Sequence, residues 1–157
     1  MIDITLIAVG KIKDRNISSL ISDYIKRIKP FAKLKIIEVE PVSFNDNNKE
    51  FAKNLESEKI LKILEKEESN PKGAVTYLLA ERGQSFNNSI DLANWYNKKS
   101  PLILVIGGSL GFSDALYSSH KQISLSPLTF PHELARLVFV EQLYRSSLII
   151  SGKSYHY

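Results

Sequence analysis

Short apolar runs rich in β-branched residues alternate along this chain with longer stretches whose apolar residues recur at helical spacing. The short runs predict strands and the longer stretches predict helices. The predicted strands are 2–9, 34–39, 74–80, 101–106 and 120–126. The predicted helices are 16–28 (capped by Asn16 or Ser18), 49–67, 87–99, a short one capped by Ser113, and 131–150. This alternation indicates an α/β fold, a single domain over residues 1–157, with a mostly parallel sheet and helices on both faces.

Two of the predicted helices differ in their apolar pattern. The stretch 49–67 is amphipathic, and we expect one face of it to carry Phe51, Leu55, Leu61 and Leu64. The stretch 131–150 is apolar almost all round. One face of a sheet cannot cover such a helix, so the pattern also predicts an interface with a second copy of the chain, most simply a two-fold dimer.

The last helix carries a few polar residues that need an explanation in so apolar a segment: His132, Glu133, Arg136, Glu141 and Arg145. Glu141 and Arg145 are four residues apart, so we expect them to pair on one face. His132 falls in the first turn, where the helix dipole disfavours a charged imidazole. Its ring suits either a hydrogen-bond partner or base for a ligand, or a cap of the helix.

The composition excludes several classes of protein. There is no cysteine, which excludes disulfide frameworks, thiol nucleophiles and cysteine-ligated zinc. The three histidines are too scattered for a metal motif, and we expect no metal. The first apolar run lacks the basic lead of a signal peptide, and no apolar stretch is long enough to cross a bilayer. We therefore expect a cytoplasmic protein without a membrane partner.

The net charge of +4 is unevenly distributed. Residues 1–35 contain eight basic and three acidic residues, a balance of +5, whereas the remainder has a balance of −1. Such an asymmetry suits a polyanionic partner. A lysine-rich, solvated helix face explains it equally well.

Glycines and polar residues gather where three predicted strands end. These strand ends are 79–83, 107–111 and 125–130. In open α/β sheets ligands bind beyond the carboxyl ends of the strands, and glycines let a ligand approach the main chain. Ordinary turn chemistry is the alternative explanation for the glycine pair Gly107–Gly108. The closing segment 151–157 carries two tyrosines and a histidine, which suit stacking on an exposed base.

Four motifs occur in order along the chain: AVGKIK at 8–13, VIGGSLG at 105–111, LSPLTFPHELARLVFVEQLYR at 125–145 and GKSYHY at 152–157. With these motifs the chain resembles the bacterial large-subunit ribosomal RNA pseudouridine N3-methyltransferases (the RlmH family), which belong to the SPOUT superfamily. The resemblance implies a homodimer with a C-terminal trefoil knot. It also implies S-adenosylmethionine as methyl donor and a pseudouridine of 23S rRNA, reached on the assembled ribosome, as acceptor.

The resemblance assigns roles to individual residues. The cofactor-binding residues would be Leu79, Gly108, Leu125, Ser126, Pro127, Leu128, Thr129 and Phe130. Candidate bases or base-positioning groups would be His132, Glu141 and His156, and the RNA would be held by Arg136, Arg145 and Tyr155. The family usually ends with a basic residue after its Tyr-His pair, whereas Tyr157 is last here, so we expect stacking in place of a phosphate contact.

Two other functions are compatible with the same residues. One is a non-catalytic RNA- or ribosome-binding factor with the same fold, which would not bind S-adenosylmethionine. The other is an unrelated nucleotide-binding α/β protein, for which an adenine nucleotide would outcompete the sulfonium cofactor.

Overall fold

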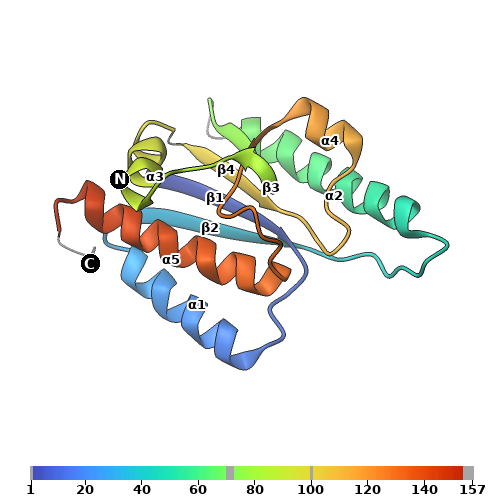
Figure 1. Ribbon diagram of the computed structural model, residues 1–157, viewed down its shortest axis with the longest axis horizontal. Helices are drawn as coiled ribbons and strands as arrows, with labels where there is room; N and C mark the ends of the chain where they lie inside the picture. The colour runs from blue at the N-terminus through green and yellow to red at the C-terminus, as the bar shows by residue number, and fades with distance from the viewer. Residues whose placement is uncertain (1, 70–72, 100, 154–157) are drawn as a thin grey trace.

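The computed structural model describes residues 2–69, 73–99 and 101–153. Within these residues five parallel strands form one sheet in the order β2-β1-β4-β3-β5, with helices on both faces (Figure 1). The predicted α/β architecture is therefore confirmed. The elements are β1 (Ile2–Val9), α1 (Arg15–Ile28), β2 (Ala32–Val39), α2 (Lys49–Ser69), β3 (Val75–Gln84), α3 (Ser89–Asn97), β4 (Leu102–Ile106), α4 (Asp114–Ser119), β5 (Lys121–Ile123) and α5 (His132–Ile150).

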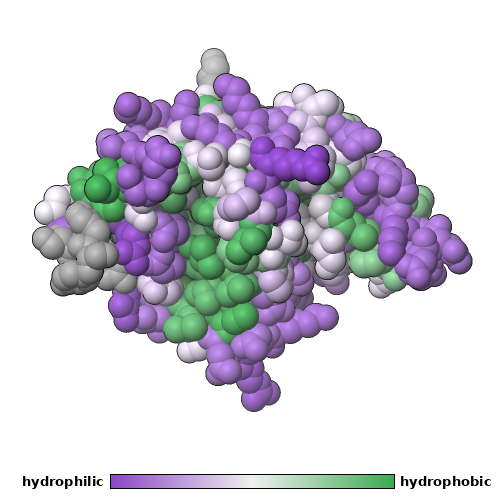
Figure 2. Space-filling model, viewed as in Figure 1, coloured by the Kyte–Doolittle hydropathy of each residue, from purple (hydrophilic) through white to green (hydrophobic). Residues whose placement is uncertain are grey.

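Helices α1, α3 and α5 cover one face of the sheet, with α1 and α5 side by side (Figure 1). The outer surface over α5 and α1 carries an apolar area bordered by polar side chains (Figure 2). Leu20 of α1 is 50% exposed and Leu134 of α5 is 37% exposed. The sheet therefore leaves part of the apolar surface of α5 uncovered, as its sequence predicted.

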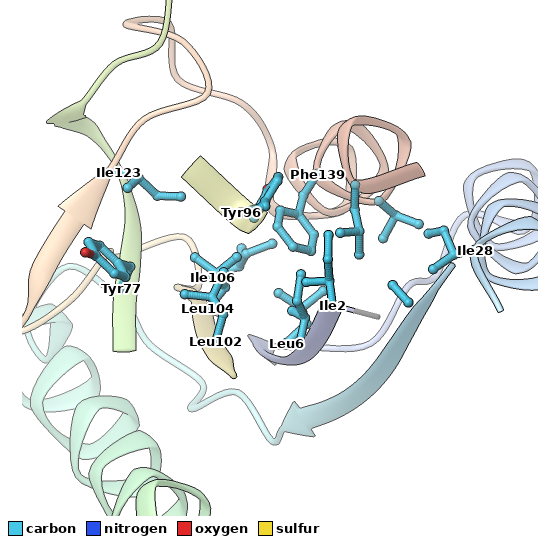
Figure 3. Close-up of a cluster of buried hydrophobic side chains, with 14 of the residues drawn as sticks. Ile2, Leu6, Ile28, Tyr77, Tyr96, Leu102, Leu104, Ile106, Ile123 and Phe139 are labelled. Carbon is cyan, nitrogen blue, oxygen red and sulfur yellow. The ribbon is translucent and has the colours of Figure 1, made fainter. Parts of the chain in front are cut away.

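Beneath these helices lies the larger of two clusters of buried side chains (Figure 3). Alternate residues of β1, such as Ile4 and Leu6, point to this face and meet Phe139 of α5 and Tyr96 of α3. The Tyr96 and Phe139 rings pack edge-on with centroids 6.4 Å apart. Complete burial raises the pKa of the Tyr96 hydroxyl, so this group stays neutral.

Helices α2 and α4 cover the other face over a second apolar cluster. The buried stripe of α2 runs through Ala52, Glu56, Ile60 and Leu64. Leu64 lies on this stripe, but the prediction that Phe51 shares a face with it was wrong, because Phe51 is 66% exposed and Leu64 is buried. A helix in which apolar residues point in several directions does not reveal by periodicity which side meets the sheet.

Several predicted boundaries also differ from the structure. Helix α1 is capped by Asp14, whose Oδ1 accepts the N–H groups of Asn16 and Ile17, rather than by Asn16 or Ser18. Strand β3 continues to Gln84, whereas β5 ends at Ile123. No helix among the described residues is long and apolar enough to cross a membrane. The trefoil knot stays a prediction.

Candidate active site

The carboxyl ends of β3, β4 and β5 lie at the same edge of the sheet, since these strands are parallel neighbours. The segments that follow them enclose a cavity of about 560 Å³, within the range of roughly 300–1,000 Å³ for small-molecule sites. Its lining includes every residue predicted to bind the cofactor except Pro127. Pro127 instead lines an adjoining cavity of about 530 Å³, which shares Ala80, Glu81, Tyr117 and Thr129 with the first.

The loop from Gly107 to Ser113, which joins β4 to α4, forms one wall of the cavity. Gly111 has φ +71°, a conformation that favours glycine, and its N–H donates to the Gly108 carbonyl at 3.1 Å. A Cβ built on Gly108 would lie 2.9 Å from Glu56 Oε2 and 3.0 Å from Val9 Cγ1. Gly111 thus meets the conformational need of a turn, whereas Gly108 is approached closely by Glu56 and Val9 of the same chain. Approach of a ligand to the pair Gly107–Gly108 stays a prediction.

The segment between β5 and α5 forms the opposite wall. Ser124 Oγ donates to the Ser126 carbonyl at 2.8 Å, and Ser126 Oγ accepts the Leu128 N–H at 3.1 Å. These bonds use the serine hydroxyls to shape the loop, while Leu128 is 68% exposed at its tip. These local bonds shape the segment from within, and the Ser124 N–H ties its beginning to β3 by donating to the Gln84 carbonyl at 2.8 Å.

The end of β3 contributes the third part of the lining. Both Leu79 and Gln84 are in register with Ile123 of β5, so residues 80–83 leave the ladder and return to it. Glu81 within this irregular segment lines both cavities. The main chain of β5 passes close to Gly83, so only glycine fits at this position: a Cβ there would lie 2.5 Å from the Ile123 carbonyl carbon.

His132 is the first residue of α5 and lines the cavity. The N-cap position is Pro131, which makes no side-chain cap bond, so the capping alternative for His132 is wrong. The ring lies against Gly10 at the end of β1, where a Cβ would stand 3.4 Å from His132 Nε2. A side chain at Gly10 would therefore crowd the imidazole, and φ of +85° also favours glycine there.

The first turns of α5 hold the segment between β1 and α1. Glu133 accepts the N–H groups of Lys13 at 2.9 Å and Asp14 at 3.1 Å, and these bonds lower the pKa of the Glu133 carboxyl. Arg136 donates to the Gly10 carbonyl at 2.6 Å and to Glu38 Oε1 at 2.6 Å. The segment 10–14 is thus fixed next to His132.

Three predicted substrate or catalytic residues of α5 lie outside the cavity lining. Arg136 is only 2% exposed and is bonded to Glu38 and Gly10, which does not suit the expected contact with RNA. Glu141 and Arg145 pair at 2.7 Å, as predicted. Glu141 lies nine residues after His132, about 14 Å along the helix, so one chain does not bring these two groups together. The predicted residues Tyr155 and His156 lie outside the described residues.

Two residues at or behind the cavity were missed by the sequence argument. Tyr117 of α4 lines both cavities, and Glu56 of α2 lies against Gly108. Glu56 occupies an apolar-stripe position, four residues from Ala52 and from Ile60, and that placement was the available signal. No cluster of histidine and acidic side chains able to hold a metal occurs in the part of the chain that the structure describes.

The parallel sheet and the cavity at its carboxyl edge define the class of protein. The family model "Predicted SPOUT methyltransferase" matches residues 2–156, and the chain belongs to this family. A solved structure concerned with 2-OH methylation of C/U34 on tRNA shares the fold, with a TM-score of 0.50 and 12% identity, covering 97% of this chain and 99% of that one.

Curated relatives cover almost the whole chain. A protein of Acetivibrio thermocellus named ribosomal RNA large subunit methyltransferase H is 39% identical, with 98% of each chain covered. A protein of Bacillus pumilus with the same name is 37% identical, with 98% of this chain and 99% of the relative covered. The family resemblance drawn from the four motifs is therefore confirmed.

Proposed function

We propose that this chain transfers the methyl group of S-adenosylmethionine to N3 of a pseudouridine in large-subunit rRNA, on the assembled ribosome in the cytoplasm. The family and the names of the relatives support a methyltransferase acting on this RNA. The observation that carries the proposal is the cavity, because residues far apart in sequence that were expected to hold the cofactor line it together.

The cavity fits the cofactor in size and in chemistry. S-adenosylmethionine supplies a methyl group already activated on a sulfonium, so the protein needs only to bind, orient and manage a proton. Apolar side chains such as Leu79, Ile106 and Phe130 would cover the cofactor, while the loops at Gly108 and Ser126 offer main-chain groups. Glu81 lines both cavities, and its carboxylate would face a cationic ligand.

His132 is the group that we assign to the proton of the acceptor N3. It lines the cavity and is held against Gly10, whereas Glu141 is already bonded to Arg145 and Gln142. We expect His132→Ala to lower kcat by about 100-fold while the Kd for the cofactor changes little. His156→Ala and Glu141→Gln test the other candidate bases. If methylation by His132→Ala stayed within a few-fold of wild type, His132 would not be the base.

The substrate would approach over the segment between β1 and α1. Lys11, Lys13 and Arg15 are exposed there, next to His132, and provide positive charge for RNA phosphates. We propose that Arg145 and Tyr155 also contact the RNA. Replacing Lys11 and Lys13 together by glutamate should reduce ribosome methylation and flatten its salt dependence. The exposed Lys62 on α2, changed to glutamate, is the matched control and should have no comparable effect.

We propose that a second copy of the chain covers the apolar area over α5. In the resulting dimer the tail of one subunit would reach the site of the other. Light scattering should give twice the chain mass for wild type and a lower mass for Leu134→Asp. Phe51→Asp is a matched control on the opposite face, since Phe51 is exposed without lying on α5. A monomeric wild type would contradict the dimer.

The whole proposal is tested by incubating labelled S-adenosylmethionine with the protein and with ribosomes, free subunits or protein-free rRNA, followed by nucleoside analysis. We expect label in N3-methylpseudouridine, greatest with ribosomes. A chain that co-sediments with ribosomes but neither binds the cofactor nor transfers label would be a non-catalytic ribosome-binding factor.

A further inference from the structure

Helix α2 contains a buried carboxylate that the proposed chemistry does not use. Glu56 is 4% exposed, and its Oε1 accepts the Val42 N–H at 2.9 Å. Its Oε2 is also buried but has no hydrogen-bond partner among the described residues. A buried carboxylate oxygen without a donor is unfavourable, so its presence calls for an explanation.

The unpartnered oxygen faces the glycine loop of the cavity. It lies 2.9 Å from the point where Gly108 would carry a Cβ. Gly108 lines the cavity and Glu56 does not, so the carboxylate lies behind the loop. The next residue, Ser57, accepts the Ser113 N–H at 2.9 Å. Two consecutive residues of α2 therefore lie against the beginning and the end of the loop 107–113.

A second buried glutamate on the same helix provides a contrast. Glu67 is 6% exposed, and its two carboxylate oxygens accept from Lys35 Nζ at 2.8 and 2.6 Å. That carboxylate is fully accounted for by an ion pair with β2 and lies away from the cavity lining. Glu56 differs from it in having one oxygen oriented by Val42 and the other left facing the loop.

We propose that Glu56 is a positioning residue for the cofactor. Its Oε2 accepts a main-chain N–H of the loop 107–111 when S-adenosylmethionine fills the cavity, and this bond holds the loop in its binding conformation from behind. The bond forms where the oxygen already approaches Gly108 closely. The inference rests on the proposed function, since it concerns the same cavity.

The test compares Glu56→Gln with Glu67→Gln by calorimetry with S-adenosylmethionine and by thermal unfolding without it. In Glu56→Gln the amide oxygen of the new side chain still accepts the Val42 N–H, but its NH₂ cannot accept a loop N–H. We expect the Kd of Glu56→Gln for S-adenosylmethionine to rise about tenfold or more. The thermal midpoint of this variant should be no more than about 2 °C below that of wild type. Glu67→Gln should lower the midpoint and leave the Kd within roughly two-fold.

An amide proton signal provides an independent measurement. In ¹H–¹⁵N spectra of wild type, we expect one amide proton of the loop 107–111 to move downfield when S-adenosylmethionine is added, and this shift should be absent in saturated Glu56→Gln. A Kd of Glu56→Gln within two-fold of wild type would overturn the inference and leave the proposed function intact. The lack of any such shift in wild type would also overturn the inference, and this result does not depend on whether the variant folds. Failure of wild type to bind the cofactor would overturn the proposed function itself.

Discussion

Two loops at the carboxyl edge of the sheet are each held by a helix distant in sequence. They differ in how many of the hydrogen bonds between loop and helix are in place. The segment 10–14 after β1 is bonded by Glu133 and Arg136 of α5, through both its N–H and its carbonyl groups. The segment 107–113 after β4 is supported by Glu56 and Ser57 of α2, where Glu56 Oε2 has no partner among the described residues.

The difference separates two kinds of binding surface. The first loop has its main-chain bonds in place, so it presents exposed basic side chains in a fixed position without help from a ligand. The second loop lines the cavity, and the Glu56 Oε2 behind it is an acceptor without a donor among the described residues. We infer that the first loop is preorganised for a large polyanion, and that the second is completed only by the small ligand.

The largest expected effect is on the first loop. Arg136→Met removes a buried guanidinium and leaves Glu38 and the Gly10 carbonyl without their partner. We expect the free energy of unfolding to fall by about 3 kcal/mol, near the lower end for a broken buried pair, since the Glu38 side chain is 37% exposed. Urea unfolding measures the loss. Glu38→Gln keeps the guanidinium and should cost less; equal losses would mean that the Gly10 bond contributes nothing.

A smaller effect is expected on the second loop. Gly108→Ala places a Cβ 2.9 Å from Glu56 Oε2 and 3.0 Å from Val9 Cγ1, so either the loop or the Glu56 side chain must shift. We expect the Kd for S-adenosylmethionine to rise about tenfold, or roughly 1.4 kcal/mol. In Gly73→Ala the added Cβ would meet nothing within 4 Å, although φ is +90°, so this control should cost stability alone. Unchanged affinity in Gly108→Ala would show that the loop is not closely held.

The smallest effect concerns pH. The N–H groups of Lys13 and Asp14 lower the pKa of Glu133 below its ordinary value of 4.5. A carboxyl with a lowered folded-state pKa contributes stability that is full above pH 4.5 and is lost as the pH falls through the folded-state value. The difference in thermal midpoint between wild type and Glu133→Gln should therefore shrink below pH 4.5. A difference independent of pH would mean that the ionised carboxylate does not hold the first loop.

Much of the fold and part of the site could be predicted because their signals are local. The order of strands and helices follows from hydrophobic periodicity, and α5 begins and ends where expected. The segment 125–130 was placed at the ligand site from the strand-end rule and the family motif, and all of it except Pro127 lines the cavity. The pair Glu141–Arg145 followed from helical spacing alone.

The failures share a cause in tertiary packing. Arg136 was assigned to the RNA through the family resemblance, but its side chain is bonded to Glu38 and Gly10, which are 98 and 126 residues away. Phe51 was expected on one face of α2 with Leu64, whereas the buried stripe contains Glu56 and Leu64 and leaves Phe51 exposed. The partners of Arg136 leave no trace in its surrounding residues, and the only local signal for the buried stripe of α2 is the spacing of Ala52, Glu56 and Ile60.

By itself the sequence determined the elements, their order, the glycine-rich strand ends and the family, because period, turn chemistry and motifs act over a few residues. Only the tertiary structure decided which elements meet. The strand order β2-β1-β4-β3-β5 brings loops from distant parts of the chain to one edge and builds the cavity. It also places α5 against the first loop and α2 behind the second, since side chains find partners through the packing of whole layers.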